Sequence, residues 1–243
     1  KEISITSATV QDKTYDGKTE ATVESVTFNG ATLKDTDYTA SAVFADKSAG
    51  NSKQATVTVT LTNGNYTFSS NGNTATATAK ISPLAVTLSW STPTSFTYDG
   101  TPKTVTATVT NKVGNDAFEL TYENNAKTDV GSYTAKVTGL GNDNYTLTGA
   151  SGTEQAWSIG VASIAGATVT LSPESFTYTG QIQTPTVTVK LGGKTLNAGS
   201  GYDVTYNGNC IDAGTYTVTV TGKGSYSGEA SSKPKYTITP APL

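Results

Sequence analysis

The chain has 243 residues, of which 35% are hydrophobic and 14% charged, and its formal net charge is −3. It has no histidine, no arginine and a single cysteine, which excludes the basic surface of a nucleic-acid-binding protein, the usual general base near neutral pH and any disulfide within the chain. Threonine, serine, glycine, asparagine and valine dominate, which predicts an all-β chain.

The first third of the chain consists of short β-branched segments separated by polar turns. In the clearest segment, Val57, Val59 and Leu61 alternate with threonines, which predicts a strand with one buried face. Asp35-Thr36-Asp37-Tyr38 is predicted to turn the chain into the third strand. The predicted strands of this third are 3–5, 21–23, 40–44, 55–62 and 74–81.

The other two thirds repeat this order of segments. In the second third the predicted strands are 86–90, 105–109, 120–122, 130–137, 143–147 and 156–159. In the last third they are 167–171, 185–190, 202–206, 213–220 and 235–238, and the segment 191–194 is predicted to be a hairpin loop.

Three landmarks recur in fixed order. The first is a turn with the sequence Tyr-Asp-Gly or Tyr-Thr-Gly, predicted to be structural because glycine permits positive φ and aspartate caps a turn. The second is a glycine that enters a long strand, and the third is a corner in which a polar residue precedes tyrosine. The turn residues are Tyr15, Asp16 and Gly17, then Tyr98, Asp99 and Gly100, then Tyr178, Thr179 and Gly180. The strand glycines are Gly50, Gly131 and Gly214, and the corners lie at Tyr66, Tyr145 and Tyr226.

The central glycines of the three turns are 83 and then 80 residues apart, a spacing that fits one small domain. We therefore predict three tandem Ig-like β-sandwich domains at 1–82, 83–160 and 161–243. The junctions are short, which predicts an elongated array of roughly 100 Å or more, from about 3.3 Å per strand residue. The last residues resemble Ser82-Pro83-Leu84 and predict the start of a further repeat.

The turn motifs resemble those of known bacterial repeats. Lys13-Thr14-Tyr15-Asp16-Gly17 resembles the YDG repeat, and the segments 96–102, 176–180 and 213–218 are similar to MBG-type and bacterial Ig-like repeats. The resemblance implies a sandwich fold and a place at the bacterial cell surface, in tandem arrays of adhesin-like proteins. It implies no catalytic residue, and Thr179 departs from the motif, which puts an obligatory role of the aspartate in doubt.

Alternative chemistries rest on weaker patterns. Calcium could bind at Asp35 with Asp37, or at Asn142, Asp143 and Asn144, but each turn offers only one or two carboxylates where several are needed. Paired carboxylates for glycoside hydrolysis do not recur among the repeats, and neither do the lysine and asparagine positions that an isopeptide bond would need. We expect no enzyme activity, no metal and no cofactor.

Aromatic side chains and the cysteine also have two interpretations. The aromatic residues could form a sugar-stacking platform, although packing in the core is favoured: Trp90, Tyr133, Tyr145, Trp157 and Tyr216. Cys210 lies in a predicted loop without a histidine, which favours an inert thiol over a nucleophile, with an intermolecular disulfide as the remaining alternative.

Repetition without a reactive group predicts a non-catalytic structural stalk or spacer segment of a large bacterial cell-surface protein. The alternative is an adhesive module that itself binds host glycan, mucin or matrix protein. In either case we expect an extracellular location, neighbouring repeats as partners, a monomer, no nucleic acid and no membrane contact by this segment, which has no signal peptide and no run of eighteen apolar residues.

Overall fold

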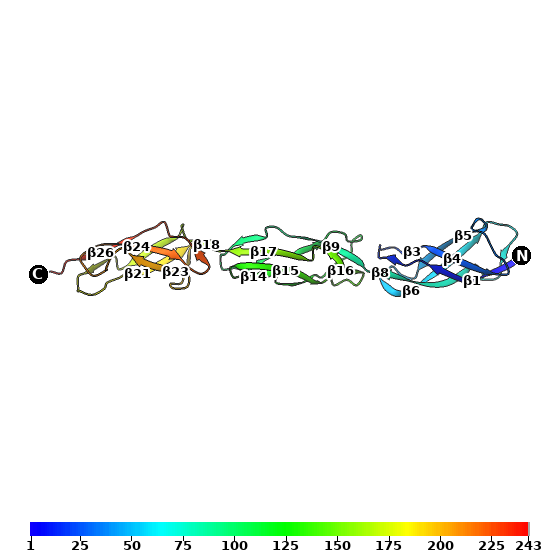
Figure 1. Ribbon diagram of the computed structural model, residues 1–243, viewed down its shortest axis with the longest axis horizontal. Coiled ribbons are helices and arrows are strands. Elements are labelled where there is room, and N and C mark those ends of the chain that lie inside the picture. The colour runs from blue at the N-terminus through cyan, green and yellow to red at the C-terminus, as the bar shows by residue number, and fades with distance from the viewer. Residues whose placement is uncertain (243) are drawn as a thin grey trace. The chain divides into compact units, whose positions relative to one another are not determined.

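The computed structural model describes residues 1–242, and their regular structure is almost entirely β-strand (Figure 1). Within these residues the helical structure is one 3-10 turn, η1 (Asp35–Asp37), so the all-β prediction is confirmed. None of them forms a helix that is long and apolar enough to cross a membrane. The chain divides into two compact units. The first comprises Lys1–Ser91, Thr106–Glu123 and Ala135–Gln155, and the second comprises Thr92–Val105, Asn124–Thr134 and the chain from Ala156 onward.

The amino-terminal part of the first unit contains two sheets. A three-stranded sheet has the order β4-β1-β7, and a five-stranded sheet has the order β2-β8-β6-β5-β3. Their strands are β1 (Glu2–Val10), β2 (Lys13–Thr14), β3 (Glu20–Ala21), β4 (Val23–Asn29), β5 (Tyr38–Phe44), β6 (Gly50–Leu61), β7 (Thr67–Phe68) and β8 (Thr74–Ser82).

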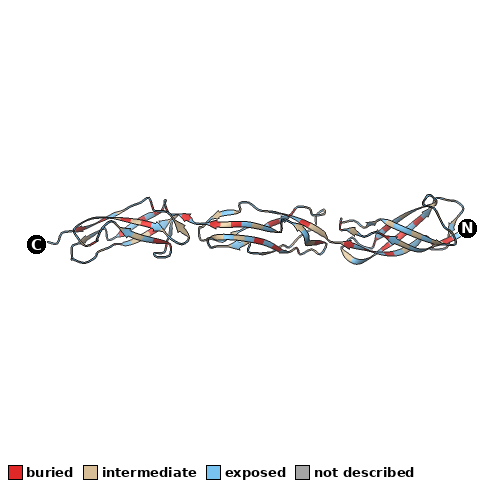
Figure 2. Ribbon diagram, viewed as in Figure 1, coloured by how far each residue is buried: buried red, intermediate tan, exposed pale blue. Residues whose placement is uncertain are grey.

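Strand β6 shows why these residues form a half-buried sheet. Val57 and Val59 are buried, at most 1% exposed, and the threonines between them face solvent. The same alternation of buried and exposed residues marks other long strands (Figure 2). A period of two suits a sheet with one face on the core, which confirms the predicted strand at 55–62.

The remaining strands of the first unit form a second β-region. It contains β9 (Leu84–Trp90), β12 (Ala107–Val109), β13 (Thr121–Glu123), β16 (Tyr145–Ser151) and part of β15 (Gly131–Gly139). Strand β9 lies between β12 and β16, and β13 pairs antiparallel with β15. Most buried side chains of the unit belong to one cluster, which includes Tyr15 from the first repeat and Tyr145 from the second.

The second unit begins with short strands of the second repeat and continues through the third. Its strands are β10 (Ser95–Thr97), β11 (Lys103–Thr104), β14 (Ala126–Lys127), most of β17 (Glu154–Gly160), β18 (Ala162–Ser163), β19 (Thr168–Ser172), β20 (Ser175–Thr177), β21 (Thr186–Leu191), β22 (Lys194–Thr195), β23 (Tyr202–Tyr206), β24 (Gly214–Gly222), β25 (Tyr226–Ser227) and β26 (Lys235–Thr239).

The third repeat again has two main sheets, β19-β21-β22 and β20-β26-β24-β23. Its core contains the fully buried Ile164, Val189 and Val218. The predicted hairpin loop is confirmed: Leu191 pairs with Lys194, and the two glycines between them have φ of 56° and 83°, which suits a tight hairpin turn.

Two predicted strands are interrupted in the structure. The segment 21–23 is divided at Thr22, because β3 pairs with β5 in one sheet while β4 pairs with β1 in the other. Of the segment 105–109 only Ala107–Val109 forms a strand, β12, which pairs with β9; residues 105–106 separate it from β11, which ends at Thr104 and pairs with β14. In both places the chain passes from one sheet to another, and alternation of side chains alone does not reveal the crossing.

Candidate functional site

The Tyr-Asp-Gly and Tyr-Thr-Gly turns each lie beside the end of the closing strand of their own repeat. Just before each turn a short strand runs parallel to the closing strand of its repeat: β2 to β8, β10 to β17 and β20 to β26. The tyrosine N–H then donates to the carbonyl of the last residue of that closing strand. These bonds are Tyr15 to Ser82 at 2.8 Å, Tyr98 to Gly160 at 2.9 Å and Tyr178 to Thr239 at 2.8 Å.

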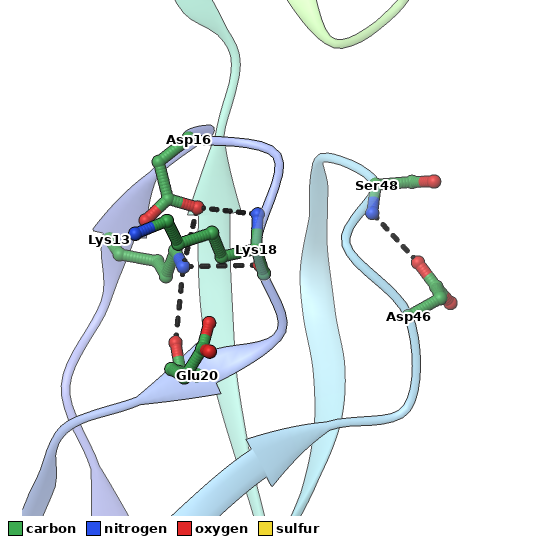
Figure 3. Close-up of polar contacts among 6 residues, drawn as sticks. All are labelled: Lys13, Asp16, Lys18, Glu20, Asp46 and Ser48. Atoms are coloured by element: carbon green, nitrogen blue, oxygen red, sulfur yellow. Dashed lines mark hydrogen bonds and ion pairs between the residues drawn. The ribbon is translucent and has the colours of Figure 1, made fainter. Parts of the chain in front are cut away.

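The first turn is held by one carboxylate and one lysine (Figure 3). Asp16 accepts the Lys18 N–H at 2.9 Å and forms an ion pair of 2.7 Å with Lys13 Nζ. The same ammonium donates to the carbonyls of Lys18 and Glu20 at 3.2 and 3.1 Å. Burial alone would raise the pKa of Asp16, but the bonds from Lys13 and Lys18 outweigh it, so the pKa is lowered and the group is ionised at neutral pH.

In the second turn an aspartate and a lysine again pair, but here the lysine follows the aspartate in the sequence instead of preceding it. Asp99 accepts the N–H and the hydroxyl of Thr101 at 2.8 and 2.6 Å and pairs with Lys103 Nζ at 2.5 Å. The hydrogen bond from Lys103, followed by those from Thr101, holds the Asp99 pKa well below its usual range. The carboxylate therefore caps a turn in its own repeat.

The third turn keeps this shape without any charge. Thr179 Oγ1 accepts the Gln181 N–H at a long 3.4 Å, and Gln183 Nε2 donates to the Thr177 carbonyl at 3.0 Å. Gln183 follows Gly180 by three residues, as Lys103 follows Gly100. Gly100 and Gly180 have φ of 79° and 71°, so the backbone of the turn is the same in both repeats. In the third turn, Thr179 and Gln183 take the places of the aspartate and the lysine.

In the first unit the Tyr15 side chain reaches into the next repeat. Tyr15 is 2% exposed, and its hydroxyl donates to Asp116 Oδ2 at 2.8 Å. The Tyr145 hydroxyl donates to the same oxygen at 2.8 Å and accepts the Val113 N–H at 2.7 Å. The two tyrosine rings meet edge to face with centroids 5.5 Å apart. One carboxylate of the second repeat thus binds a tyrosine from each repeat.

The electrostatics of this cluster fix its protonation state. Burial and then the hydrogen bond to Asp116 raise the pKa of Tyr15 to about 12. Burial also raises the pKa of Tyr145. The two hydroxyls, Tyr15 first, lower the pKa of Asp116. At neutral pH the cluster therefore consists of two neutral phenols and one carboxylate.

Close packing and a further hydrogen bond complete this junction. A Cβ on Gly17 would lie 2.6 Å from Val113 Cγ1, so the second repeat occupies the space that a side chain would need. Gly17 also has φ of 75°. Nearby, the Ala49 N–H donates to Asn144 Oδ1 at 2.9 Å. Glycine is thus required here both by the backbone and by the neighbouring repeat.

In the second unit the Tyr98 turn makes the same kind of contact. The rings of Tyr98 and Tyr226 meet edge to face with centroids 5.5 Å apart, and a Cβ on Gly100 would collide with Lys194 Nζ. Tyr226 follows Tyr98 by 128 residues and Tyr145 follows Tyr15 by 130, so both pairs join a turn to the polar-Tyr corner of the next repeat. The junction recurs with different side chains around it.

Comparison with family models assigns each part of the chain. Residues 1–77 match the YDG domain, residues 86–153 the MBG domain (YGX type) and residues 167–241 the MBG domain. The chain is a tandem of one YDG domain and two MBG domains. This confirms the resemblance predicted from the turn motifs.

Other comparisons add little to this assignment. No curated protein sequence matches the chain. Among solved structures, it is similar to the SGBP-B of the Bacteroides ovatus mixed-linkage glucan utilization locus, in complex with a mixed-linkage heptasaccharide. The identity is 10% and the TM-score 0.21 over 99% of this chain and 71% of that one, a likeness too low to carry an argument.

The aromatic residues proposed as a platform, four in the second domain and one in the third, are engaged in packing and hydrogen bonds. Trp157 is 3% exposed and donates from Nε1 to the Asn124 carbonyl at 3.0 Å, so its ring faces are not free to stack on a sugar. Trp90 Nε1 donates to the Gly152 carbonyl at 2.7 Å. Tyr216 is buried and stacks on Tyr236 with centroids 5.3 Å apart. Tyr145 belongs to the first junction, and Tyr133 packs on Trp157.

Two of the polar residues proposed for calcium, Asp37 and Asn142, are engaged in capping turns. Asp37 accepts the Lys34 N–H and the Asn63 amide, both at 2.9 Å. Asn142 accepts the Asn144 N–H at 3.1 Å. Within residues 1–242, no group of three or more His, Cys, Asp or Glu side chains is placed to hold a metal ion.

Cys210 is a buried residue of the second MBG domain. It is 4% exposed and adopts φ of 57°, and its Sγ lies 3.6 Å from the Gly208 carbonyl. Burial, followed by a hydrogen bond with Cys210, raises the pKa of Tyr236. The thiol thus lies inside the fold, where a second chain could reach it only after local unfolding.

Three lysines with largely covered side chains, 17–19% exposed, bear on the isopeptide alternative. Each places its ammonium on an aspartate: Lys13 on Asp16, Lys53 on Asp46 and Lys103 on Asp99. A Lys–Asn isopeptide bond would require an asparagine at that position instead.

The sequence predicts the turns but not the residues of the following domain that contact them. Tyr145 and Tyr226 were identified as landmarks, without the expectation that each meets the turn of the preceding domain. Val113, Asp116 and Lys194 carry no recurring motif. The available signal was the similar spacing, 130 and 128 residues, between each turn and the polar-Tyr corner of the next repeat.

Proposed function

We propose that this chain is a non-catalytic spacer segment of a large, extracellular bacterial cell-surface protein. The observation that carries the proposal is that the tyrosines of the two internal turns contact the following domain. The Tyr15 hydroxyl donates a hydrogen bond to Asp116, and the Tyr98 ring packs on Tyr226. Asp16 and Asp99 cap their own turns. The most distinctive residues of the chain serve to join domains and to shape the turns that join them.

The kinds of domain in the chain support the same proposal. YDG and MBG domains resemble repeats of bacterial surface proteins, and a spacer needs domains that fold by packing and connect in a defined way. Threonine-rich exposed faces, as on β6, keep the sheets hydrated with few charges. The chain then acts by holding other parts of its protein away from the cell.

Direct binding of glycan or mucin is the second candidate, and one feature of the first unit favours it. An open groove of about 540 Å³ is lined by Thr108, Lys112, Phe118 and Tyr122, among others. Aromatic edges beside hydroxyl and ammonium groups suit a sugar. The rings are half-buried, and Phe118 packs on Tyr145 with centroids 4.7 Å apart, so much of their surface is already used.

A binding experiment separates the two functions. The chain is applied to a glycan array and to immobilised mucin, and a spacer is expected to show no saturable binding. Saturable binding that is lost in Tyr122→Ala and retained in Tyr133→Ala would overturn the spacer proposal and support the groove. Release of reducing sugar from the same glycans, which we expect to be absent, tests the non-catalytic part.

A further inference from the structure

The third turn has the backbone of the first two but lies exposed. Tyr178 donates its N–H to Thr239 at 2.8 Å, as Tyr15 and Tyr98 donate to the ends of their closing strands. Yet Tyr178 is 40% exposed, whereas Tyr15 is 2% exposed and Tyr98 half-buried. Ile182, two residues after Gly180, is 69% exposed. Among the described residues, four large apolar side chains are markedly exposed, and two of them belong to this turn.

Each internal turn packs on the polar-Tyr corner of the following domain, which lies beside the first residues of that domain. The YDG domain has the same arrangement at its own start. Where a domain begins, its first residues run parallel to the strand of the polar-Tyr corner. The Leu84 N–H donates to Asn144, beside Tyr145, at 2.9 Å, and the Ala162 N–H donates to Ser225, beside Tyr226, at 3.0 Å. The amino group of Lys1 donates to the Asn65 carbonyl at 2.7 Å. Tyr66 therefore stands where Tyr145 and Tyr226 stand.

We propose that the exposed face of Tyr178, Gly180 and Ile182 binds the beginning of another YDG or MBG domain, with Tyr178 packing edge to face on the tyrosine of its polar-Tyr corner. The occupant is identified by recurrence: two chemically different junctions place the same turn on the same corner. The Asp116 carboxylate is not required, because the Tyr98 junction consists of a ring pair and a lysine.

This inference rests on the proposed spacer function and deepens it by naming the partner of the third turn. It predicts that the face of Tyr178, Gly180 and Ile182 binds a domain that is connected to the chain in one particular register. A domain that follows Thr239 in the register that Ser82 and Leu84 define brings its corner tyrosine onto Tyr178. A domain joined through a long flexible linker gains less, because the linker leaves its orientation open.

The test joins residues 1–240 of one copy to a second, complete copy, with Lys1 of the second placed directly after Pro240 of the first. This spacing repeats Ser82, Pro83 and Leu84, since Thr239 corresponds to Ser82 and Lys1 to Leu84. Hydrogen exchange at the amides of residues 180–184 in the first copy is compared with that in the single chain. We expect exchange to slow by about tenfold or more in the joined protein.

One substitution at two places provides the matched control. Tyr66→Ala in the second copy removes the receiving ring and is expected to restore the exchange rates of the single chain. Tyr66→Ala in the first copy has the same local effect on its domain and is expected to leave the protection unchanged. Equal exchange in the joined and single chains overturns the proposal, and so does protection that responds alike to both substitutions.

The outcome is distinguishable from failure of the spacer function. Absence of protection at Tyr178 would leave the glycan and mucin results unaffected. Saturable glycan binding would overturn the spacer function whatever the exchange at this turn.

Discussion

The Tyr15 hydroxyl donates a 2.8 Å hydrogen bond to Asp116, which lies 101 residues further along the chain and in the next domain. Tyr145 donates to the same carboxylate oxygen. A motif that looks like a local turn thus supplies the contact between two domains. This relationship explains why tyrosine and glycine recur at the turn in all three copies, whereas the aspartate does not.

Removing the Tyr15 hydroxyl tests the strength of the first junction. Tyr15→Phe keeps the buried ring but leaves Asp116 with one phenol instead of two, and a hydrogen bond to a charged group typically contributes about 1.5–3 kcal/mol. We expect that loss in the free energy of urea unfolding. Tyr98→Phe is the matched control, since the Tyr98 contact is between rings, and it should change stability little. Equal losses in the two variants would contradict the assigned role of the hydroxyl.

Glycine substitutions separate backbone strain from contact with the next domain. Gly17 and Gly180 have nearly the same φ, 75° and 71°, so alanine at either costs about 1 kcal/mol of backbone strain. At Gly17 the Cβ also meets Val113 Cγ1 at 2.6 Å, whereas at Gly180 the nearest atom is the Tyr178 hydroxyl at 3.7 Å. Overpacking adds about 1–3 kcal/mol, so Gly17→Ala should destabilise the protein more than Gly180→Ala. Similar unfolding free energies would show that Val113 moves aside without cost.

Acidification should weaken the first junction. The Asp116 pKa is lower in the folded chain than its ordinary value, so the group contributes stability above that ordinary value, near 4, and loses it as pH falls through the folded pKa. The protection factors of the amides around Tyr15 and Val113, which are the intrinsic exchange rates divided by the observed ones, are expected to fall below about pH 4. Asp116→Asn should show low protection factors at these amides already at neutral pH, with little further change on acidification. An unchanged acid response in this variant would assign the effect to other carboxylates.

Alkaline titration tests the same cluster from the tyrosine side. The Tyr15 pKa is raised to about 12, so its contribution to stability is complete below about pH 10 and is lost as pH rises toward 12. Ultraviolet difference titration of wild type and Tyr15→Phe should differ by one phenol that ionises near pH 12. A difference centred near pH 10 would mean that Tyr15 is solvated and that the junction is open in solution.

Much of the fold could be predicted from the sequence because its signals are local. Alternation at Val57 and Val59 predicts a strand, and the glycine pair at 192–193 predicts a hairpin. The crossing between sheets at Thr22 could not be predicted, since side-chain alternation is the same on both sides of it. The junction could not be predicted either, because Asp116 and Val113 act through positions that only the packing of consecutive domains brings close to Tyr15.

A double-mutant cycle between Tyr15→Phe and Asp116→Asn tests most directly the claim that the first tyrosine turn joins its domain to the next. The free energy of urea unfolding is measured for the wild type, the two single variants and the double variant. The hydrogen bond between the two side chains predicts a coupling free energy of about 1 kcal/mol or more, so the double variant should lose less stability than the sum of the two single variants. Additive losses would contradict a direct bond between the turn and the next domain.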